Sequence, residues 1–133
     1  MNSDYEVEFS VEGVPVGQGS LRHVGNGRLV HAAKLVTWRE HVVEAVQDQA
    51  ELTDMITGAV CVIMHFRVPH LIARPKWPST RSSGDLDKLV RAIGDALTMG
   101  GLIEDDSRII KLQATKTYAD NPGVTIKLGK AWD

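Results

Sequence analysis

Apolar and polar residues alternate near the beginning of the chain, between residues 5 and 12. A period of two is typical of a half-buried strand, and the solvated face of this one is acidic. From Ala32 to about Leu52 the apolar spacing changes to three and four residues, which predicts a long amphipathic helix. The buried stripe of that helix is expected to contain Leu35, Trp38, Val42, Ala45, Val46 and Gln49.

The segment between this strand and this helix carries a turn signal. Gly25-Asn26-Gly27 separates two short runs of apolar and basic residues, at 21–24 and 28–31. Because glycine and asparagine tolerate positive φ, the pattern predicts a small basic hairpin.

The second half of the chain predicts one more helix and three more strands. Residues 59–68 begin with apolar side chains on both faces, as expected of a central strand. A helix is expected from about Leu86 to Thr98, ended by Gly100-Gly101. The last two strands are expected around 109–117 and 124–128. We therefore expect one α+β domain over residues 1–133, with a mixed sheet of about four main strands packed by two helices.

Composition narrows the class of protein. A chain of 133 residues suits one domain, and a single cysteine excludes a disulfide framework and a cysteine-rich metal site. The longest apolar run, residues 59–64, is far shorter than the roughly 20 residues needed to cross a bilayer. No basic or apolar stretch follows Met1, so we expect no signal peptide, no membrane partner and a cytoplasmic location.

Charge is balanced overall but segregated along the chain. The net charge is −2, yet residues 20–39 carry four bases and no acid, and residues 67–91 carry six bases and two acids. Such a chain can present a positive face to a polyanion. The alternative is ordinary surface charge that happens to cluster. Residues 69–84 also form a long proline-containing loop, and loops of that length are usually functional or mobile.

Two acidic pairs flank the second helix. Asp85 and Asp87 lie at its start, and Asp105-Asp106 lie just before the next strand. If that strand packs beside the helix, Asp106 can approach the Asp85 end. Carboxylates gathered around one point need a cation, and hard oxygen ligands suit Mg²⁺ or Mn²⁺. The alternative is structural, because aspartate is common at helix N-termini and in turns. The residues alone leave both interpretations open.

The same residues resemble a known family. The run Gly84-Asp85-Leu86-Asp87 with the rest of the helix to Thr98, followed by residues 101–106, is similar to the core of RusA-type Holliday junction resolvases. The family pattern is Asp-x-Asp-Asn-x-x-Lys, then Asp-Ala-Leu, a glycine-containing turn and an Asp-Asp pair. The clear match covers about residues 84–118, and weaker similarity extends over nearly the whole chain. These enzymes are small homodimeric, Mg²⁺-dependent endonucleases, frequently carried by phages and prophages.

The resemblance implies roles for individual residues. Asp85, Asp87 and Asp106 match the metal-binding acids, and Asp105 matches a neighbouring acid that we include as a candidate ligand. Asp95 matches a helix aspartate that we interpret as structural. Two positions depart from the family: Lys88 stands at the asparagine, and Arg91 at the active-site lysine. If the lysine acts through its charge, Arg91 or Lys88 can replace it as a catalytic residue. If it transfers a proton, activity is in doubt, because arginine does not donate a proton near neutral pH.

The implied activity is a crossover junction endodeoxyribonuclease that cuts four-way DNA junctions by paired symmetric nicks, in recombination and repair. It would use Mg²⁺, with Mn²⁺ as a substitute, and act as a homodimer. Trp77 is expected either to stack on an opened base or to be buried against a neighbouring element or at a dimer interface. The expected phosphate contacts are Arg22, Arg28, Arg67, Arg74, Lys76 and Arg81. Two alternatives remain: a RusA-like module that binds branched DNA without cutting it, because of Arg91, and a small structural domain whose aspartates only cap helices.

Overall fold

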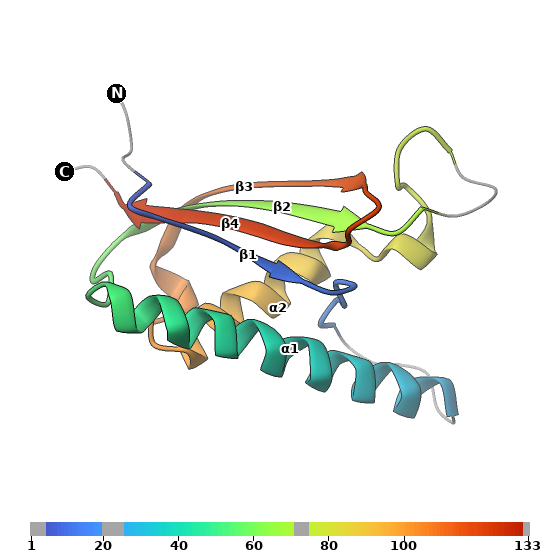
Figure 1. Ribbon diagram of the computed structural model, residues 1–133, viewed down its shortest axis with the longest axis horizontal. Coiled ribbons are helices and arrows are strands. Elements are labelled where there is room, and N and C mark those ends of the chain that lie inside the picture. Colours follow the sequence, from blue (N-terminus) through green and yellow to red (C-terminus); the bar gives the residue numbers. More distant parts are fainter. Residues whose placement is uncertain (1–4, 20–25, 71–74, 132–133) are drawn as a thin grey trace.

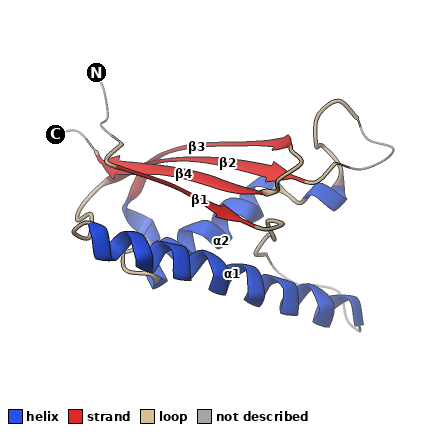
Figure 2. Ribbon diagram, in the orientation of Figure 1, coloured by secondary structure: helices blue, strands red, loops and turns tan. Residues whose placement is uncertain are grey.

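The computed structural model describes residues 5–19, 26–70 and 75–131, with side chains from His31 onward in the first helix. One sheet of four strands is packed on one face by two helices, as Figures 1 and 2 show. The elements in chain order are β1 (Val7–Glu12), α1 (Asn26–Leu52), β2 (Val60–Val68), α2 (Leu86–Met99), β3 (Ile109–Tyr118) and β4 (Gly123–Lys130). Single 3₁₀ turns precede α2 and β3: η1 (Arg81–Ser83) and η2 (Asp106–Arg108). The α+β class is therefore confirmed.

The sheet has the strand order β1-β4-β2-β3. Strand β4 pairs antiparallel with both β1 and β2, whereas β2 and β3 run parallel. The sheet is therefore mixed, as predicted. Parallel neighbours need a long crossover connection, and here the chain from residue 69 to residue 108, including α2, supplies it.

The core lies between the sheet and the two helices. Alternate residues of β1 and β4 face it, and β2 is buried along most of its length because it lies between two other strands. The helices contribute the stripes that the sequence predicts, including Trp38 and Val42 of α1 and Leu89 and Ile93 of α2. At the edge strand β3 burial decreases, and Ile110 and Leu112 remain 59% and 45% exposed.

The predicted hairpin is wrong wherever the structure describes it. Residues 26–31 form the first turns of α1, which begins at Asn26 rather than near Ala32, and residues 20–25 lie outside the described residues. Glycine and asparagine are turn residues, but they are also favoured at helix N-termini. Extending the helix satisfies the backbone of this segment within the helix itself, without a strand partner.

Helix α2 ends in a Schellman motif. The amide of Leu102 donates to the carbonyl of Leu97 at 3.1 Å, and that of Gly101 donates to Thr98 at 3.1 Å. Gly101 has a φ of +81°, the left-handed conformation that glycine adopts at low cost. Gly100, one residue earlier, lies so close to α1 that a Cβ there would collide with the Val46 side chain. The chain after α2 therefore lies in close contact with α1 at the point where it turns back toward β3.

Among the described residues, no helix combines the length and the apolar character needed to cross a membrane.

Substituting Gly100 tests this close approach. We expect Gly100→Ala to lower the free energy of unfolding by about 1–3 kcal/mol, because the added methyl group overpacks the contact with Val46. In a Val46→Ala background the same substitution should cost clearly less. A double-mutant cycle measured by urea denaturation gives this coupling. Equal costs in both backgrounds would contradict the packing described.

Candidate active site

One exposed face of α2 carries the charged residues of the candidate site. Asp87, Arg91 and Gly94 follow one another at spacings of four and three residues, so they share a face of the helix. The opposite face, with Leu89, Ile93 and Leu97, is buried in the core. The amphipathic pattern of α2 therefore fixes the direction in which Asp87 and Arg91 point.

Asp85 is the N-cap residue of α2, but its side chain does not cap the helix. Its backbone is extended, with φ −75° and ψ 130°, and its carbonyl accepts hydrogen bonds from the amides of Lys88 and Leu89 at 3.1 and 3.0 Å. No side-chain capping bond links it to the described part of α2. The exposed carboxylate thus makes none of the capping hydrogen bonds to α2 that the structural interpretation of this residue expects.

Asp87 is ionised and paired with its neighbour. Its Oδ2 accepts a hydrogen bond from Lys88 Nζ at 2.9 Å, and this bond is the main cause that lowers the pKa of Asp87 below its usual value. The charges of Lys88 and Arg91 lower this pKa further. The side chain remains 67% exposed, so an incoming cation can compete with Lys88 for the carboxylate.

The second acidic pair divides into two environments. Asp105 caps η2, because its Oδ2 accepts the amide of Ser107 at 2.9 Å, and this bond lowers the pKa of Asp105. Asp106 is exposed and lies against α2: its Cβ is 3.5 Å from the position that a Cβ on Gly94 would occupy. Asp106 therefore joins the face that carries Asp87 and Arg91.

The four acids do not form one cluster in the single chain. Gly94 is seven residues after Asp87, which corresponds to about 10 Å along a helix axis. Within the described ranges, no three or more histidine, cysteine, aspartate or glutamate side chains are arranged to hold a metal ion. Asp85 and Asp87, at one end of α2, still suit a hard cation, because Mg²⁺ is commonly held by one or two carboxylates together with water and phosphate oxygens. Ligation by Asp105 and Asp106 stays a prediction.

Lys116 of β3, which is not among the predicted site residues, contacts the loop that leads into Asp85. Its Nζ donates to Ser83 Oγ at 3.0 Å and to the carbonyl of Gly84. Burial lowers the pKa of Lys116, while the charge of Asp85 opposes that shift. The signal was present in the sequence: Lys116 occupies the register of Ile110, Leu112 and Ala114, where the alternation predicts an apolar residue.

Asp95 has the structural role that the sequence predicts for it. It accepts a hydrogen bond from Gln18 Nε2 at 2.5 Å, and Gln18 in turn accepts one from Arg39 of α1. The backbone N–H of Gln18 also donates to the backbone carbonyl of Lys88 at 2.9 Å. The loop after β1 is thereby tied to both helices.

The predicted phosphate contacts fall into three groups. Lys76 and Arg81 are exposed on the loop that precedes α2. The guanidinium of Arg67 donates to Glu12 Oε2 at 3.1 Å, to the carbonyl of Asn121 at 3.0 Å and to Thr125 Oγ1 at 2.6 Å, so each of its three nitrogens already makes a hydrogen bond within the protein. Arg22, Arg74 and the side chain of Arg28 lie outside the described residues.

Trp77 lies between the exposed cations of this loop. Its side chain is 61% exposed, and Lys76 Nζ lies 5.5 Å from its ring centroid. Its carbonyl accepts a hydrogen bond of 3.4 Å from the hydroxyl of Tyr118, the last residue of β3. The ring is therefore presented to solvent rather than packed into the core.

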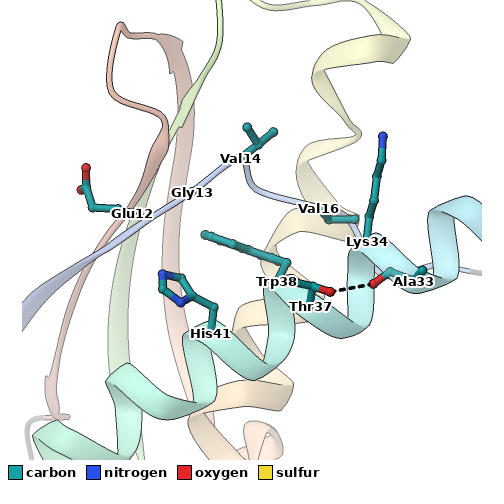
Figure 3. A pocket seen from close by; sticks show the side chains of 9 residues that line it. All are labelled: Glu12, Gly13, Val14, Val16, Ala33, Lys34, Thr37, Trp38 and His41. Atoms are coloured by element: carbon teal, nitrogen blue, oxygen red, sulfur yellow. Dashed lines mark hydrogen bonds between the residues drawn. The ribbon is translucent and has the colours of Figure 1, made fainter.

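A cavity of about 580 Å³ lies elsewhere, where the chain leaving β1 crosses the first half of α1. Figure 3 shows that its lining comes from these two segments, with Trp38 and His41 on the helix side and Val14 and Val16 on the other. None of the predicted acidic site residues lines it. The acidic face of α2 is therefore an open surface rather than the wall of this cavity.

Two comparisons with known proteins give matches over most of the chain. A family model described as endodeoxyribonuclease RusA matches residues 11–129. The chain is also similar to the uncharacterized protein YqaN of Bacillus subtilis (strain 168), with 29% identity over 92% of this chain and 94% of that protein. Endodeoxyribonucleases of this family hydrolyse DNA and generally depend on a divalent metal ion. Because the match includes both acidic motifs and nearly the whole fold, this protein belongs to the RusA family of endodeoxyribonucleases.

Proposed function

We propose that this protein cuts four-way DNA junctions by paired symmetric nicks, with Mg²⁺ or Mn²⁺ bound at the N-terminus of α2. It would act in recombination and repair, in the cytoplasm of a bacterial cell or a phage-infected host. The observation that carries the proposal is the exposed carboxylate of Asp85, which makes no capping bond to the described helix and lies two residues from Asp87. This pair lies within the residues that the family model matches, 11–129.

The chemistry divides between the metal and the side chains of α2. A bound divalent ion lowers the pKa of water and withdraws charge from the phosphate during hydrolysis. Asp85 and Asp87 would hold it, with Asp105 and Asp106 as further predicted ligands. Arg91 is the better candidate for the cation that faces the scissile phosphate, since Lys88 already pairs with Asp87 at 2.9 Å. An arginine there stabilises negative charge but transfers no proton.

Substrate binding is expected from the loop that precedes α2. Lys76 and Arg81 can contact phosphates, and the exposed ring of Trp77 can stack on a base unpaired at the junction. Both features are close in sequence to the Asp85 end of α2, so a strand held by the loop passes the acidic pair. The predicted contacts of Arg22, Arg28 and Arg74 would extend this surface.

A homodimer suits the approximate two-fold symmetry of a four-way junction, which requires two cutting sites. The edge strand β3 offers a surface for it, because the side chains of Ile110 and Leu112 are 59% and 45% exposed. Pairing of two copies across this edge would cover apolar area that a single chain leaves in water.

Binding without cleavage is the second candidate function. It is favoured by one observation, the arginine at position 91, because a reaction that needs a proton from the family's lysine would stop there. Nicking of a synthetic four-way junction by the purified protein in Mg²⁺, and its loss in EDTA, separates the two functions.

Neutralising either acid of the α2 pair tests the metal site. We expect Asp85→Asn and Asp87→Asn each to lower the rate of junction cleavage by at least about 100-fold, because a ligand to the ion and its charge are lost. Affinity for the junction should stay within a few-fold, since removing an acid does not weaken phosphate contacts. Cleavage and gel-shift assays on one labelled junction measure both.

The matched control is Asp48→Asn, an exposed acid on α1, which should cleave at the wild-type rate. Wild-type cleavage by both the Asp85 and Asp87 variants would exclude this pair as the metal site.

Removing the loop cations tests the substrate surface. We expect Lys76→Ala and Arg81→Ala each to weaken junction binding and to reduce the slope of log affinity against log salt concentration by about 1, as for one lost phosphate contact. Fluorescence anisotropy at several salt concentrations gives the slope. Lys130→Ala, at the end of β4 that pairs with the start of β2, serves as the control and should leave the slope unchanged. An unchanged slope for both loop variants would remove this loop from the interface.

A charge on the β3 edge tests the dimer. Leu112→Glu should convert the protein from dimer to monomer, because two glutamates would face each other in a buried contact. Size-exclusion chromatography with light scattering reads the mass directly. A dimer that persists in this variant, with an unchanged melting temperature, would place the contact elsewhere.

A further inference from the structure

We propose that Lys116 of β3 is a positioning residue of the nuclease site: it holds the loop before α2 so that the Asp85 carboxylate faces solvent and metal instead of the helix end. This inference rests on the proposed function, because it assigns a role to a residue that supports the same site. It adds a residue from the sheet to a set otherwise drawn from α2 and η2.

Lys116 connects the edge strand β3 to the part of the loop that lies immediately before α2. It pairs in register with Phe66 of β2, and Phe66 is completely buried. The backbone of Lys116 is thus held in the sheet, and its Nζ donates to Ser83 Oγ at 3.0 Å and to the carbonyl of Gly84. One ammonium group thus holds the two residues that immediately precede Asp85.

Ser83 passes this constraint on to the rest of the loop. Its side chain is buried, and its hydroxyl lies 2.8 Å from the carbonyl of Pro78 and 2.7 Å from that of Thr80. A hydroxyl has one proton, which these two carbonyls share, and its lone pairs accept from Lys116. Lys116, Ser83 and the turn at 78–80 therefore form one connected hydrogen-bond network.

The bond to the Gly84 carbonyl acts directly on Asp85. A peptide unit is planar, so the oxygen of Gly84 and the nitrogen of Asp85 lie in one rigid plane. Holding that oxygen fixes the plane from which the Asp85 backbone continues. Gly84 itself has φ +88°, a conformation that residues with a Cβ rarely adopt. The backbone of Asp85, which continues from this plane, is extended, with φ −75° and ψ 130°.

Stability alone does not account for a lysine at this place. Burying an ammonium group is costly, and the lowered pKa of Lys116 reflects that cost. A methionine of similar length would fill the same space in the apolar register of β3 without it. A merely structural role therefore predicts that Lys116→Met keeps both the fold and the activity. A positioning role predicts that Lys116→Met folds but that its loop before α2 is less ordered and its rate of cleavage is lower.

The experiment compares Lys116→Met, Lys116→Arg and Ser83→Ala with the wild type, and uses Lys130→Met as the matched control. We expect Lys116→Met to lower kcat for junction cleavage by roughly 10- to 100-fold, as for residues that orient metal ligands. Junction affinity in EDTA should stay within about threefold, because the loop cations remain.

Hydrogen exchange measured by mass spectrometry should accelerate in the peptide covering residues 78–86 and not in α1. Lys116→Arg should restore most of both readouts, since a guanidinium also donates to two acceptors.

Ser83→Ala keeps the lysine but removes one of its acceptors, so it should show the same exchange signature with a smaller loss of kcat. If Lys116→Met does not melt cooperatively, the hydrogen exchange and kcat of Ser83→Ala test the proposal in its place. Wild-type exchange at residues 78–86 in the folded variants, or wild-type kcat in Lys116→Met, would overturn the proposal. If the wild-type protein itself cuts no junction in Mg²⁺, the proposed function fails, whereas the exchange measurement still tests the anchor.

Discussion

The parallel pairing of β2 with β3 is the constraint on which the site depends. Two parallel neighbours cannot be joined by a tight turn, so the chain must cross the sheet before it returns. Both acidic pairs lie on this crossover, one at the start of α2 and the other in η2, where the chain enters β3. Helix α2 and strand β3 run in opposite directions, as Figure 1 shows, so the Asp85 end of the helix lies near the end of β3 and not near its beginning.

This geometry explains how the charges are distributed over the site. The charge of Asp85 interacts with that of Lys116, which lies near the end of β3. Asp87 accepts a hydrogen bond from Lys88 on the same helix. Asp106 instead packs beside Gly94, where the absence of a side chain leaves room for it. Carboxylates are thus kept apart in the single chain and are partly balanced by cations. That arrangement limits their mutual repulsion before an ion binds.

An acidic chain can still bind DNA because the local arrangement of charge, not the total, meets the phosphates. The net charge is −2, and four of the acids, Glu40, Glu44, Asp48 and Glu51, lie on α1. Lys76, Arg81 and the exposed Trp77 instead lie on the loop beside the Asp85 end of α2. In the proposed function, this cationic loop would hold the backbone of a strand by its phosphates, while the acidic pair beside it would bind the metal ion.

The sequence by itself determined the class of fold, the stripes of both helices and the acidic motifs, because periodicity and motif spacing are local properties that the backbone geometry of helices and strands expresses directly. It misassigned residues 26–31, where the same glycine and asparagine suit a turn or a helix start. Tertiary structure alone decided the rest. In the folded chain, Arg67 donates hydrogen bonds to Glu12, Asn121 and Thr125. Asp106 packs beside Gly94, and Lys116 donates to the carbonyl of Gly84. Each of these contacts joins residues that are distant along the chain, and strand order, which no local pattern encodes, chooses their partners.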